Sequence, residues 1–337
     1  MRKITAFICV FLIVGTMVFA GGGGERAAGE RLTSPVTFRL AHVYNPGHPW
    51  DVGAHLAADI VRERTNGMID IQVYPSSQLG TEEQVLEAAV LGSIEIVQSG
   101  GAQIGNLFRA FNVFEMPYTF RDNDHVLLFA KTDMAKRMYD DLEKEFGVTV
   151  LTTSSFGVRQ LTSNRPITTP ADLRGFKLRV PEQQITMAYA RAMGADPTPI
   201  ALAEAYMALQ QNVVDGLENP LSSIFNMRFH EVQRYINLTS HVTNANFFVM
   251  NSRVYHGLHP HYQAILHEAF DAAAIRIVEI LNDDDRRLGE TFRQAGVTVH
   301  QPDLEAFRRA TAGMPEEFRS WWSAYGADLH SRIQNLR

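Results

Sequence analysis

Arg179 is the side chain whose type and position say most about chemistry. It lies in a predicted strand at residues 176–180, where three apolar side chains share one face and Lys177 and Arg179 share the other, because strand side chains alternate. Pro181 ends the strand, so we expect the guanidinium to project at its carboxyl end. A guanidinium binds a carboxylate through two parallel hydrogen bonds. The spacing alone is at least as compatible with a solvated arginine at the edge of a sheet as with an arginine that binds a carboxylate.

Arg159 and Asn219 are two further candidates for binding an anion. Arg159 follows a predicted strand and precedes a turn at residues 164–166, at a possible crossover between lobes. Asn219 comes just past an apolar strand, where its amide can donate to an acid and accept from a hydroxyl. From sequence position alone, Arg159 can equally be interpreted as a surface cation, and Asn219 as a turn residue before Pro220.

The elements that position these residues alternate between short β-like runs and longer helical runs. In the first part of the chain, strands are predicted at residues 37–41, 69–74 and 94–97, and helices at residues 50–65 and 81–92. The second helix opens with a capping box, in which Thr81 accepts from the first turn and Gln84 reaches back. Strands that alternate with helices predict βαβ units and a mainly parallel sheet.

The same alternation resumes after residue 148 and predicts a second α/β lobe. Strands are expected at residues 148–152, 176–180, 197–200, 213–217 and 241–250, and helices at residues 169–173, 183–193, 203–211 and 262–287. The last of these is one long helix with apolar residues at helical spacing. Two α/β lobes suggest a cleft between them, and ligands of open α/β sheets bind beyond the carboxyl ends of the strands.

Charge and the N-terminus limit the classes of partner and location. The 337 residues contain 31 Lys and Arg against 37 Asp and Glu, a net charge of −6, without a basic block, so nucleic acid is not an expected partner. Arg2 and Lys3 precede an apolar run that ends in a small-residue pattern, which predicts an export signal at residues 1–20 and a flexible leader at residues 21–32. An uncleaved anchor is the alternative. The only cysteine, Cys9, lies inside the signal, so the exported chain has no thiol.

Five longer motifs indicate a family. They are TTPADLRGFKLRVPEQQ at residues 168–184, AMGADPTPIALAEAYMALQQNVVDGLENP at residues 192–220, YPSSQLGTEEQVLEAAVLGSIEI at residues 74–96, MPYTF at residues 116–120 and FGVRQLTSNRPI at residues 156–167. Together they strongly resemble the solute-binding proteins of tripartite ATP-independent periplasmic (TRAP) transporters, the DctP-type family. The motifs stand in the family's order and run over nearly all of the exported chain.

The resemblance implies an α/β receptor with two lobes and a ligand cleft between them, located in the periplasm, and not an enzyme. Such a receptor closes on a small organic acid and delivers it to the small and large permease subunits in the membrane. We expect it to be a monomer. By similarity, lobe I comprises residues 33–156 and 245–284, and lobe II comprises residues 157–244 and 285–337.

The resemblance also assigns roles to individual residues. The family's principal carboxylate-clamping arginine falls on Arg179, because its basic strand precedes Val180-Pro181. A second ligand-contacting arginine falls on Arg159, and the ligand-binding asparagine of the family falls on Asn219.

Four other polar residues are candidates for the rest of the pocket. His42 follows the first strand, Gln98 follows the third, and Glu182 comes directly after Pro181. Glu182 could accept hydrogen bonds from hydroxyl groups or stabilise a helix N-terminus, and Glu82 has the same two interpretations. Because these residues offer several partners for hydroxyl groups, we expect a sugar acid such as a uronate. A C4-dicarboxylate is the second possibility.

Two other classes of function are weaker predictions. Glu204, Asp215 and Glu218 could supply the paired carboxylates of an exported hydrolase or lyase, but the usual catalytic motifs of those enzymes are missing from the sequence. Three histidines crowd into HGLHPH at residues 256–261, where imidazoles could share a zinc, although a solvated loop is the simpler interpretation. We therefore expect no catalytic residue, no cofactor and no metal.

Overall fold

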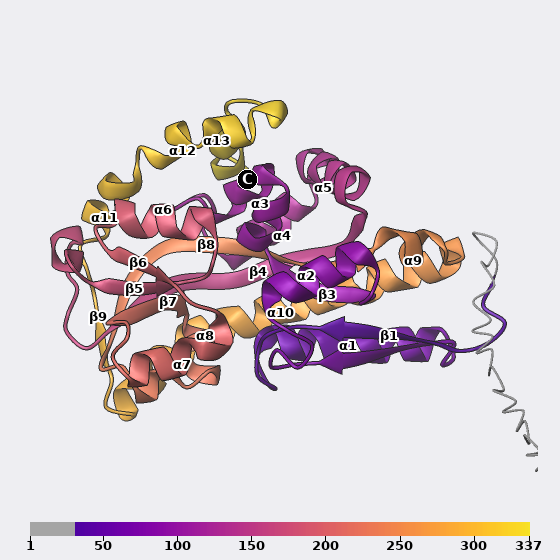
Figure 1. Cartoon of the computed structure of the whole chain (residues 1–337), viewed down its shortest axis with the longest axis horizontal. Coiled ribbons are helices and arrows are strands. Elements are labelled where there is room, and N and C mark those ends of the chain that lie inside the picture. The colour runs from indigo at the N-terminus through magenta and orange to yellow at the C-terminus, as the bar shows by residue number, and fades with distance from the viewer. Residues whose placement is uncertain (1–30) are drawn as a thin grey trace, which may run out of the picture.

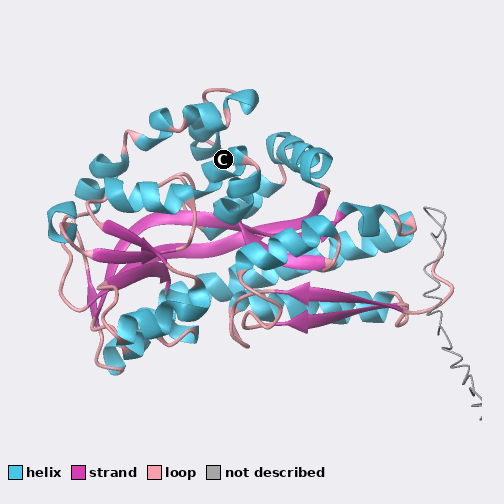
Figure 2. Cartoon of the chain, in the orientation of Figure 1, coloured by secondary structure: helices cyan, strands magenta, loops and turns pink. Residues whose placement is uncertain are grey.

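A computed structural model describes residues 31–337 as one nine-stranded sheet with helices on both faces (Figures 1 and 2). The strands are, in spatial order, β2 (Ile69–Tyr74), β1 (Val36–Ala41), β3 (Ile96–Gly100), β8 (Tyr235–Asn251), β4 (Val148–Ser163), β7 (Gly216–Pro220), β5 (Lys177–Val180) and β6 (Asp196–Pro199), and β9 (Thr298–His300) pairs with β8. The predicted signal peptide, and the predicted leader except for its last two residues, lie outside the described residues.

The half of the sheet around β1 to β3 begins as the sequence predicts. β1 pairs in parallel with both β2 and β3, and α1 (Pro49–Arg64) and α2 (Glu82–Leu91) are the crossover helices. The predicted capping box is present, since Thr81 Oγ1 accepts from Gln84 N and the Gln84 side chain accepts from Thr81 N. Gly92 ends α2 in the left-handed region, with φ 80°.

The centre of the sheet is antiparallel, so the prediction of a mainly parallel sheet is wrong there. β4 and β8 pair along most of their lengths, β8 also pairs antiparallel with β3, and β4 pairs antiparallel with β7. Both strands extend beyond the predicted residues 148–152 and 241–250. Much of the added length of β4 is serine and threonine, which resembles a turn in sequence. Ser154 and Ser155 are nevertheless fully buried, because their hydroxyls donate to neighbouring oxygens.

The half around β5 to β7 is parallel again, and lies at the left of Figure 1. Its helices are η2 (Pro170–Leu173), α6 (Gln184–Ala192), α7 (Leu202–Gln210), α8 (Leu221–Asn226) and η3 (Phe229–Glu231). The strand predicted at residues 213–217 begins later, at Gly216, because the chain is still turning after α7, where Asn212 has φ 56°.

The predicted long helix is α10 (Pro260–Gln294), which spans 35 residues and follows the short α9 (Ser252–His256). Its first part joins α1 in one hydrophobic core, where Ala269 and Ile277 are fully buried. Its last part contributes Leu288 and Phe292 to a second core with α7 and α8. With β4 and β8, α10 therefore runs through both halves of the molecule (Figure 1). No helix within residues 31–337 is long and apolar enough to cross a membrane.

The remaining helices lie mainly over the upper side of the sheet in Figure 1. They are α3 (Gly101–Leu107), η1 (Arg109–Glu115), α4 (Asn123–Ala130), α5 (Asp133–Phe146), α11 (Leu304–Thr311), α12 (Met314–Glu317), η4 (Arg319–Trp321), η5 (Ser323–Tyr325) and α13 (Leu329–Gln334). The C-terminal residues return to α5, where the Tyr325 hydroxyl donates to Asp141 Oδ2 at 2.7 Å. The end of predicted lobe II thus contacts predicted lobe I.

Gly157 allows three elements to meet in the middle of the molecule. It lies at an irregularity in the pairing of β4 with β8 and has φ 113°. A Cβ atom there would come within 2.8 Å of Pro220 Cβ in β7 and 3.3 Å of Leu281 Cδ2 in α10. Both the backbone conformation and the close approach therefore require glycine.

We expect Gly157→Ala to lower the free energy of unfolding by about 1–3 kcal/mol, because alanine strains the backbone and contacts Pro220. Urea denaturation measures this change. Gly313→Ala is the matched control, since nothing lies within 4 Å of a Cβ at that position, and its effect should stay within about 0.5 kcal/mol. Equal stability of the two variants would contradict the role of Gly157.

Candidate functional site

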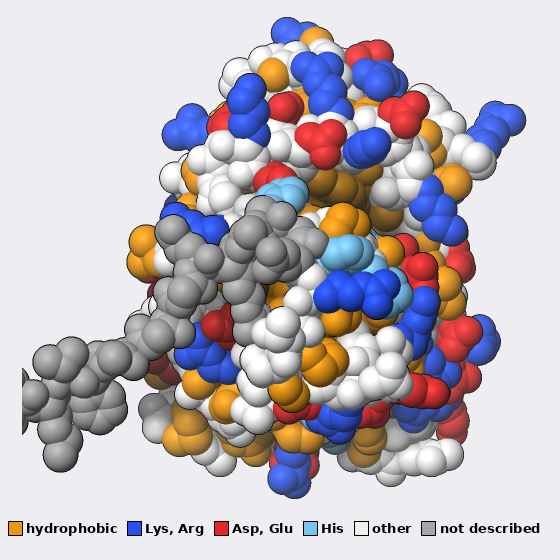
Figure 3. All heavy atoms as spheres, turned by 90° about the vertical axis from the view of Figure 1, so that its right-hand side faces the viewer, with side chains coloured by type: hydrophobic (Ala, Val, Ile, Leu, Met, Phe, Trp, Pro, Cys, Tyr) orange, Lys and Arg blue, Asp and Glu red, His pale blue; other side chains and the backbone are white. Residues whose placement is uncertain are grey.

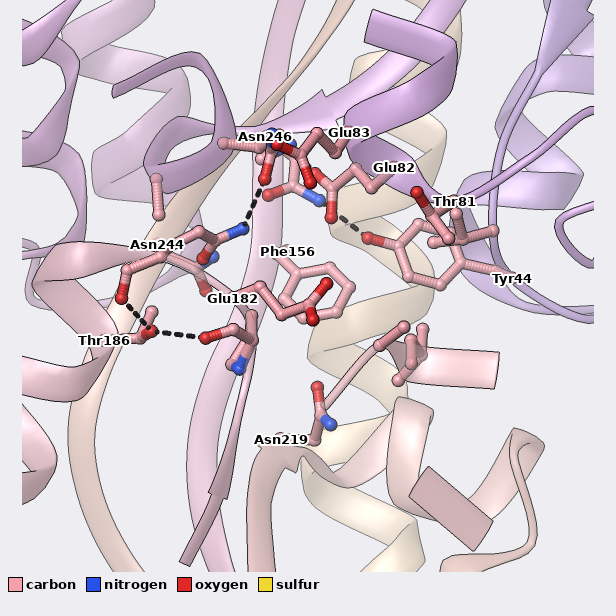
Figure 4. A pocket seen from close by; sticks show the side chains of 18 of the residues that line it. Tyr44, Thr81, Glu82, Glu83, Phe156, Glu182, Thr186, Asn219, Asn244 and Asn246 are labelled. Carbon is pink, nitrogen blue, oxygen red and sulfur yellow. Dashed lines mark hydrogen bonds between the residues drawn. The ribbon is translucent and has the colours of Figure 1, made fainter. Parts of the chain in front are cut away.

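A cavity with about 790 Å³ of empty space, partly open to solvent, lies between the two halves of the molecule (Figure 4). Five of the residues predicted from the sequence line it, namely Arg159, Arg179, Asn219, Glu82 and Glu182. Glu82 comes from the half around β1 to β3, and Arg179 and Asn219 come from the half around β5 to β7.

Arg179 is buried in the wall of this cavity rather than solvated. Only 2% of its surface is exposed, and its Nε and Nη2 atoms donate to the carbonyl oxygen of Ile200 at 2.8 and 2.5 Å. Among residues 31–337, no carboxylate forms an ion pair with it. Burial lowers the pKa of Arg179 to about 10, and the attraction of Glu218 offsets this only in part. The guanidinium is thus charged at neutral pH without a counter-charge of its own.

Arg159 differs from Arg179 in having a partner. It lies within β4 rather than after a strand, and its guanidinium forms a bidentate ion pair with Glu218 of β7, with Nη2 2.7 Å from Oε1. Burial disfavours both charges, but the mutual attraction outweighs it, raising the pKa of Arg159 and lowering the pKa of Glu218 to about 2. His241 Nε2 lies 3.4 Å from Glu218 Oε2, and burial lowers the pKa of His241.

Three buried asparagines present unused hydrogen-bonding atoms to the cavity. Within the described part of the chain, Asn219 Nδ2, Asn244 Oδ1 and Asn246 Oδ1 have no hydrogen-bond partner. The other ends of two of these amides are fixed, since Asn246 Nδ2 donates to the Tyr44 hydroxyl at 3.0 Å and Asn244 Nδ2 donates to Glu115 Oε1 at 3.1 Å. Buried polar atoms are rarely left unpaired. The cavity therefore offers one free donor and two free acceptors to a polar ligand.

The carboxyl groups of the cavity have different surroundings. Glu82 Oε1 accepts from Gly100 N at 2.6 Å and from Ser99 Oγ at 3.3 Å, while burial raises the pKa of Glu82. Glu83 and Glu182 are exposed at the edge of the cavity (Figure 4). Glu82 and Glu83 of α2 and Glu182, which follows β5, therefore bring carboxylates to the cavity from both halves.

Several lining residues received no role from the sequence, Asn244 and Asn246 among them. Glu115, directly before the MPYTF motif, was missed, as was Tyr44 beyond the first strand. Phe156, the first residue of the FGVRQLTSNRPI motif, also lines the cavity. Its ring stacks on Tyr44 at 5.4 Å, and the Arg159 guanidinium lies 5.5 Å from its centre. The motifs therefore marked the neighbourhood of Glu115 and Phe156 without identifying their chemistry.

Two of the predicted residues do not line the cavity. His42 is 1% exposed, and its Nε2 atom lies 3.3 Å from Asp51 Oδ1, behind the cavity wall. Gln98 is fully buried in β3. The structure thus brings five predicted residues together and places His42 and Gln98 behind them.

Side-chain contacts join the two halves around the cavity. Gln183 Nε2 donates to Gln103 Oε1 at 3.3 Å, and Asn106 Nδ2 donates to the carbonyl oxygen of Glu182 at 3.4 Å. On the other side, His48 Nε2 lies 2.9 Å from Ser223 Oγ. These contacts close the halves over the cavity and explain why Arg179 and Asn219 are almost inaccessible.

The residues considered for a hydrolase are not arranged as a catalytic pair. Glu218 is committed to Arg159, Asp215 Oδ2 accepts from the backbone N–H of Lys177 at 2.8 Å, and Glu204 is exposed. Glu218 and Asp215 thus have separate partners, and Glu204 lies at the surface.

The histidines of HGLHPH are also separated in their contacts. His256 Nε2 lies 2.6 Å from Glu143 Oε1, whereas His259 accepts from His261 N at the start of α10. No group of three or more potential metal ligands is found within residues 31–337. On the face seen in Figure 3, histidines lie among interspersed Lys, Arg, Asp and Glu side chains.

The sequence matches a known family and curated proteins of similar length. The model of the family described as bacterial extracellular solute-binding protein, family 7, matches residues 40–320. The sialic acid-binding periplasmic protein SiaP of Vibrio cholerae serotype O1 is 33% identical over 294 residues, which cover 87% of this chain and 92% of SiaP. The C4-dicarboxylate-binding periplasmic protein DctP of Rhodobacter capsulatus is 30% identical over 299 residues, covering 88% and 89% of the two chains.

Solved structures agree with the fold. The TRAP periplasmic solute-binding protein of Polaromonas sp. JS666, bound to D-erythronate, has a TM-score of 0.85 at 28% identity, covering 90% of this chain and 99% of that chain. The corresponding protein of Actinobacillus succinogenes 130Z, with bound L-galactonate, has a TM-score of 0.83 at 30% identity, covering 89% and 98%. These comparisons confirm the predicted resemblance and the predicted two-lobed α/β receptor fold.

Replacing Glu218 by Gln removes the counter-charge of Arg159 but preserves the size of the side chain. We expect Glu218→Gln to lose about 3–5 kcal/mol of unfolding free energy at pH 7, because it leaves a buried charge uncompensated. Urea denaturation at several pH values measures this loss. The pair stabilises the fold above pH 4.5, the ordinary pKa of the glutamate, and this contribution is lost as the pH falls toward 2.

The acid sensitivity between pH 4.5 and 2 should therefore be weaker in Glu218→Gln than in the unmodified protein. Glu279→Gln is the control, because Glu279 forms an exposed ion pair with Arg276 on α10 and should change stability by less than about 1 kcal/mol. If both variants lost a similarly small amount of unfolding free energy, the buried ion pair would not stabilise the fold more than an exposed one.

Proposed function

Since the chain belongs to family 7 of the bacterial extracellular solute-binding proteins, we propose that it is the receptor of a TRAP transporter and binds an organic acid through Arg179. Proteins of this family are substrate-binding receptors rather than enzymes. TRAP receptors bind small organic acids and work with membrane permease components.

The single observation that supports this proposal is the buried Arg179 without a counter-charge. A buried cation is costly unless an anion pairs with it. The Ile200 carbonyl supplies only a partial negative charge at one edge of the guanidinium. A ligand carboxylate would supply the missing charge, and Asn219 Nδ2 would supply a further donor.

In this proposal Arg159 does not act as a second unpaired cation. Glu218 balances its charge, so Arg159 adds directed N–H groups to the cavity without adding net charge. The Arg159–Glu218 pair orients these groups, and Arg179 attracts the anion.

We propose a sugar acid, such as a uronate, as the ligand class. Asn244 Oδ1 and Asn246 Oδ1 are free acceptors, and Glu82 and Glu182 are carboxylates, so the lining of the cavity suits ligand hydroxyl groups. A second ligand carboxylate would meet like charges there. The structural neighbours with bound D-erythronate and L-galactonate support the same class.

A C4-dicarboxylate is the second candidate, because the 30% identical relative from Rhodobacter capsulatus is a C4-dicarboxylate-binding protein. With either ligand, His42 and Gln98 would affect the cavity indirectly. His42 would do so through its contact with Asp51, and Gln98 through its packing in β3.

We further propose a periplasmic location, reached through a cleaved signal peptide, and transfer of the ligand to the small and large permease subunits by a monomer. The proposed lobes are residues 33–156 with 245–284 and residues 157–244 with 285–337. Their closure on the ligand would involve β4, β8 and α10, which run through both halves. The contacts of Tyr325 with α5 make the C-terminal residues a further connection.

A thermal-shift screen tests the ligand class. We expect D-glucuronate, L-galactonate or D-erythronate to raise the melting temperature by about 5 °C near saturation, and succinate to raise it less, because succinate offers no hydroxyl donors. Chromatography of the incubated acid should recover it unchanged. A larger shift with succinate would favour the dicarboxylate alternative, and new products would overturn the receptor function.

Arg179→Met tests the clamp with the acid that gives the largest shift. We expect calorimetry to show affinity weakened by tens to thousands of fold, equivalent to about 2–5 kcal/mol. The unliganded variant should be as stable as the unmodified protein or more stable, because methionine replaces an uncompensated buried charge.

Lys177→Met is the matched control, since it removes the exposed cation of the same strand, and its affinity should not change. Unaltered acid affinity in Arg179→Met would defeat the assignment of the clamp.

A further inference from the structure

Glu115 is a buried acid of the cavity that the Arg179 clamp does not use. It is the last residue of η1, is 2% exposed and lines the cavity. Its Oε1 atom accepts from Asn244 Nδ2 at 3.1 Å, and the backbone N–H of Ala102 also faces the carboxyl group. A Cβ at Gly101 would lie 3.3 Å from this oxygen, so the glycine makes room for the carboxyl group.

The charges that face Glu115 do not compensate a carboxylate. Arg159 of β4 attracts it, but that guanidinium is already paired with Glu218 of β7, which repels Glu115. Tyr189 of α6 faces the same group, and burial raises the pKa of its phenol well above the ordinary value, so it stays neutral. His241 of β8, beside Glu218, also stays neutral because burial lowers its pKa.

Burial is the largest effect on Glu115. It raises the pKa of Glu115 to about 8, although the attraction of Arg159 and the hydrogen bonds from Asn244 and from the backbone of Ala102 oppose it. Oε1 accepts from Asn244, so the proton of the neutral acid is carried by Oε2. Glu115 therefore differs from Glu83 and Glu182, which are exposed at the edge of the cavity.

We propose that Glu115 binds the ligand as a neutral carboxylic acid and donates a hydrogen bond from Oε2 to the ligand carboxylate. This inference rests on the proposed function as an organic-acid receptor. Glu115 is then a specificity-determining residue, because it adds a donor for an anion without adding a cation. Its ionised form would lose the donor and repel the ligand.

The consequence is that binding of the acid and binding of a proton favour each other. Above pH 8 the free protein has lost the Glu115 proton, so binding must take up a proton from solution. The affinity should then fall about tenfold between pH 7 and pH 9. Arg179, with a pKa of about 10, and Arg159, with a raised pKa, stay charged over this range.

Calorimetry with D-glucuronate and with L-galactonate tests the inference, using pairs of buffers with different ionisation enthalpies at each pH. For the unmodified protein we expect affinity about tenfold weaker at pH 9 than at pH 7, and uptake approaching one proton per ligand at pH 9. Glu115→Gln should bind within a few fold at pH 7 and keep its affinity at pH 9, because the amide donates at every pH.

Glu87→Gln is the control, since Glu87 is an exposed carboxylate on α2. The affinity of this variant should fall with pH as steeply as that of the unmodified protein. An unmodified protein that binds either acid without proton uptake, or a Glu115→Gln variant that keeps the full slope, would overturn the role of Glu115 alone. Failure of the unmodified protein to bind either acid at pH 7 would instead overturn the sugar-acid function, and this inference with it. Proton uptake by the unmodified protein decides the question even if Glu115→Gln does not fold.

Discussion

The unequal pairing of two buried arginines is the constraint on which the cavity depends. Arg159 and Arg179 are 4% and 2% exposed, but Glu218 neutralises the first, while the second has only a backbone carbonyl. The Arg159–Glu218 pair is therefore neutral, whereas no carboxylate of the described residues contacts Arg179, and the cost of this buried charge falls when a single anionic group binds to it. A ligand with one carboxylate fits this balance, and Glu82 and Glu182, which also line the cavity, can accept hydrogen bonds from its hydroxyl groups.

The sheet sets this arrangement through its register. Arg159 pairs with Pro220 and Leu161 pairs with Glu218 across β4 and β7, so Arg159 and Glu218 are diagonal neighbours on one face. A slip of one residue would turn the two side chains to opposite faces. β5, beside β7, adds Arg179 opposite Leu217. The geometry of the charges thus follows from backbone pairing, which is far more rigid than the long side chains themselves.

Local patterns predicted the elements that local interactions determine. The capping box of Thr81 and Gln84 and the end of α2 both depend on residues close in sequence. The length of β4 could not be predicted in this way, because its buried hydroxyls find partners in distant elements. The same holds for the site: the types of Arg179 and Asn219 indicated anion binding, but the commitment of Arg159 to Glu218 spans 59 residues. Glu115 gave no signal, since its chemistry arises from burial.

The order of the elements also determines when the chain can fold. β8 lies between β3 and β4, and α10 packs against α1, so the earliest strands and helices need partners from the last third of the sequence. A polypeptide synthesised only as far as β7 has no means of completing its first hydrophobic core. The proposed export suits this order, because a chain whose first core is completed late cannot fold stably until most of it has been synthesised.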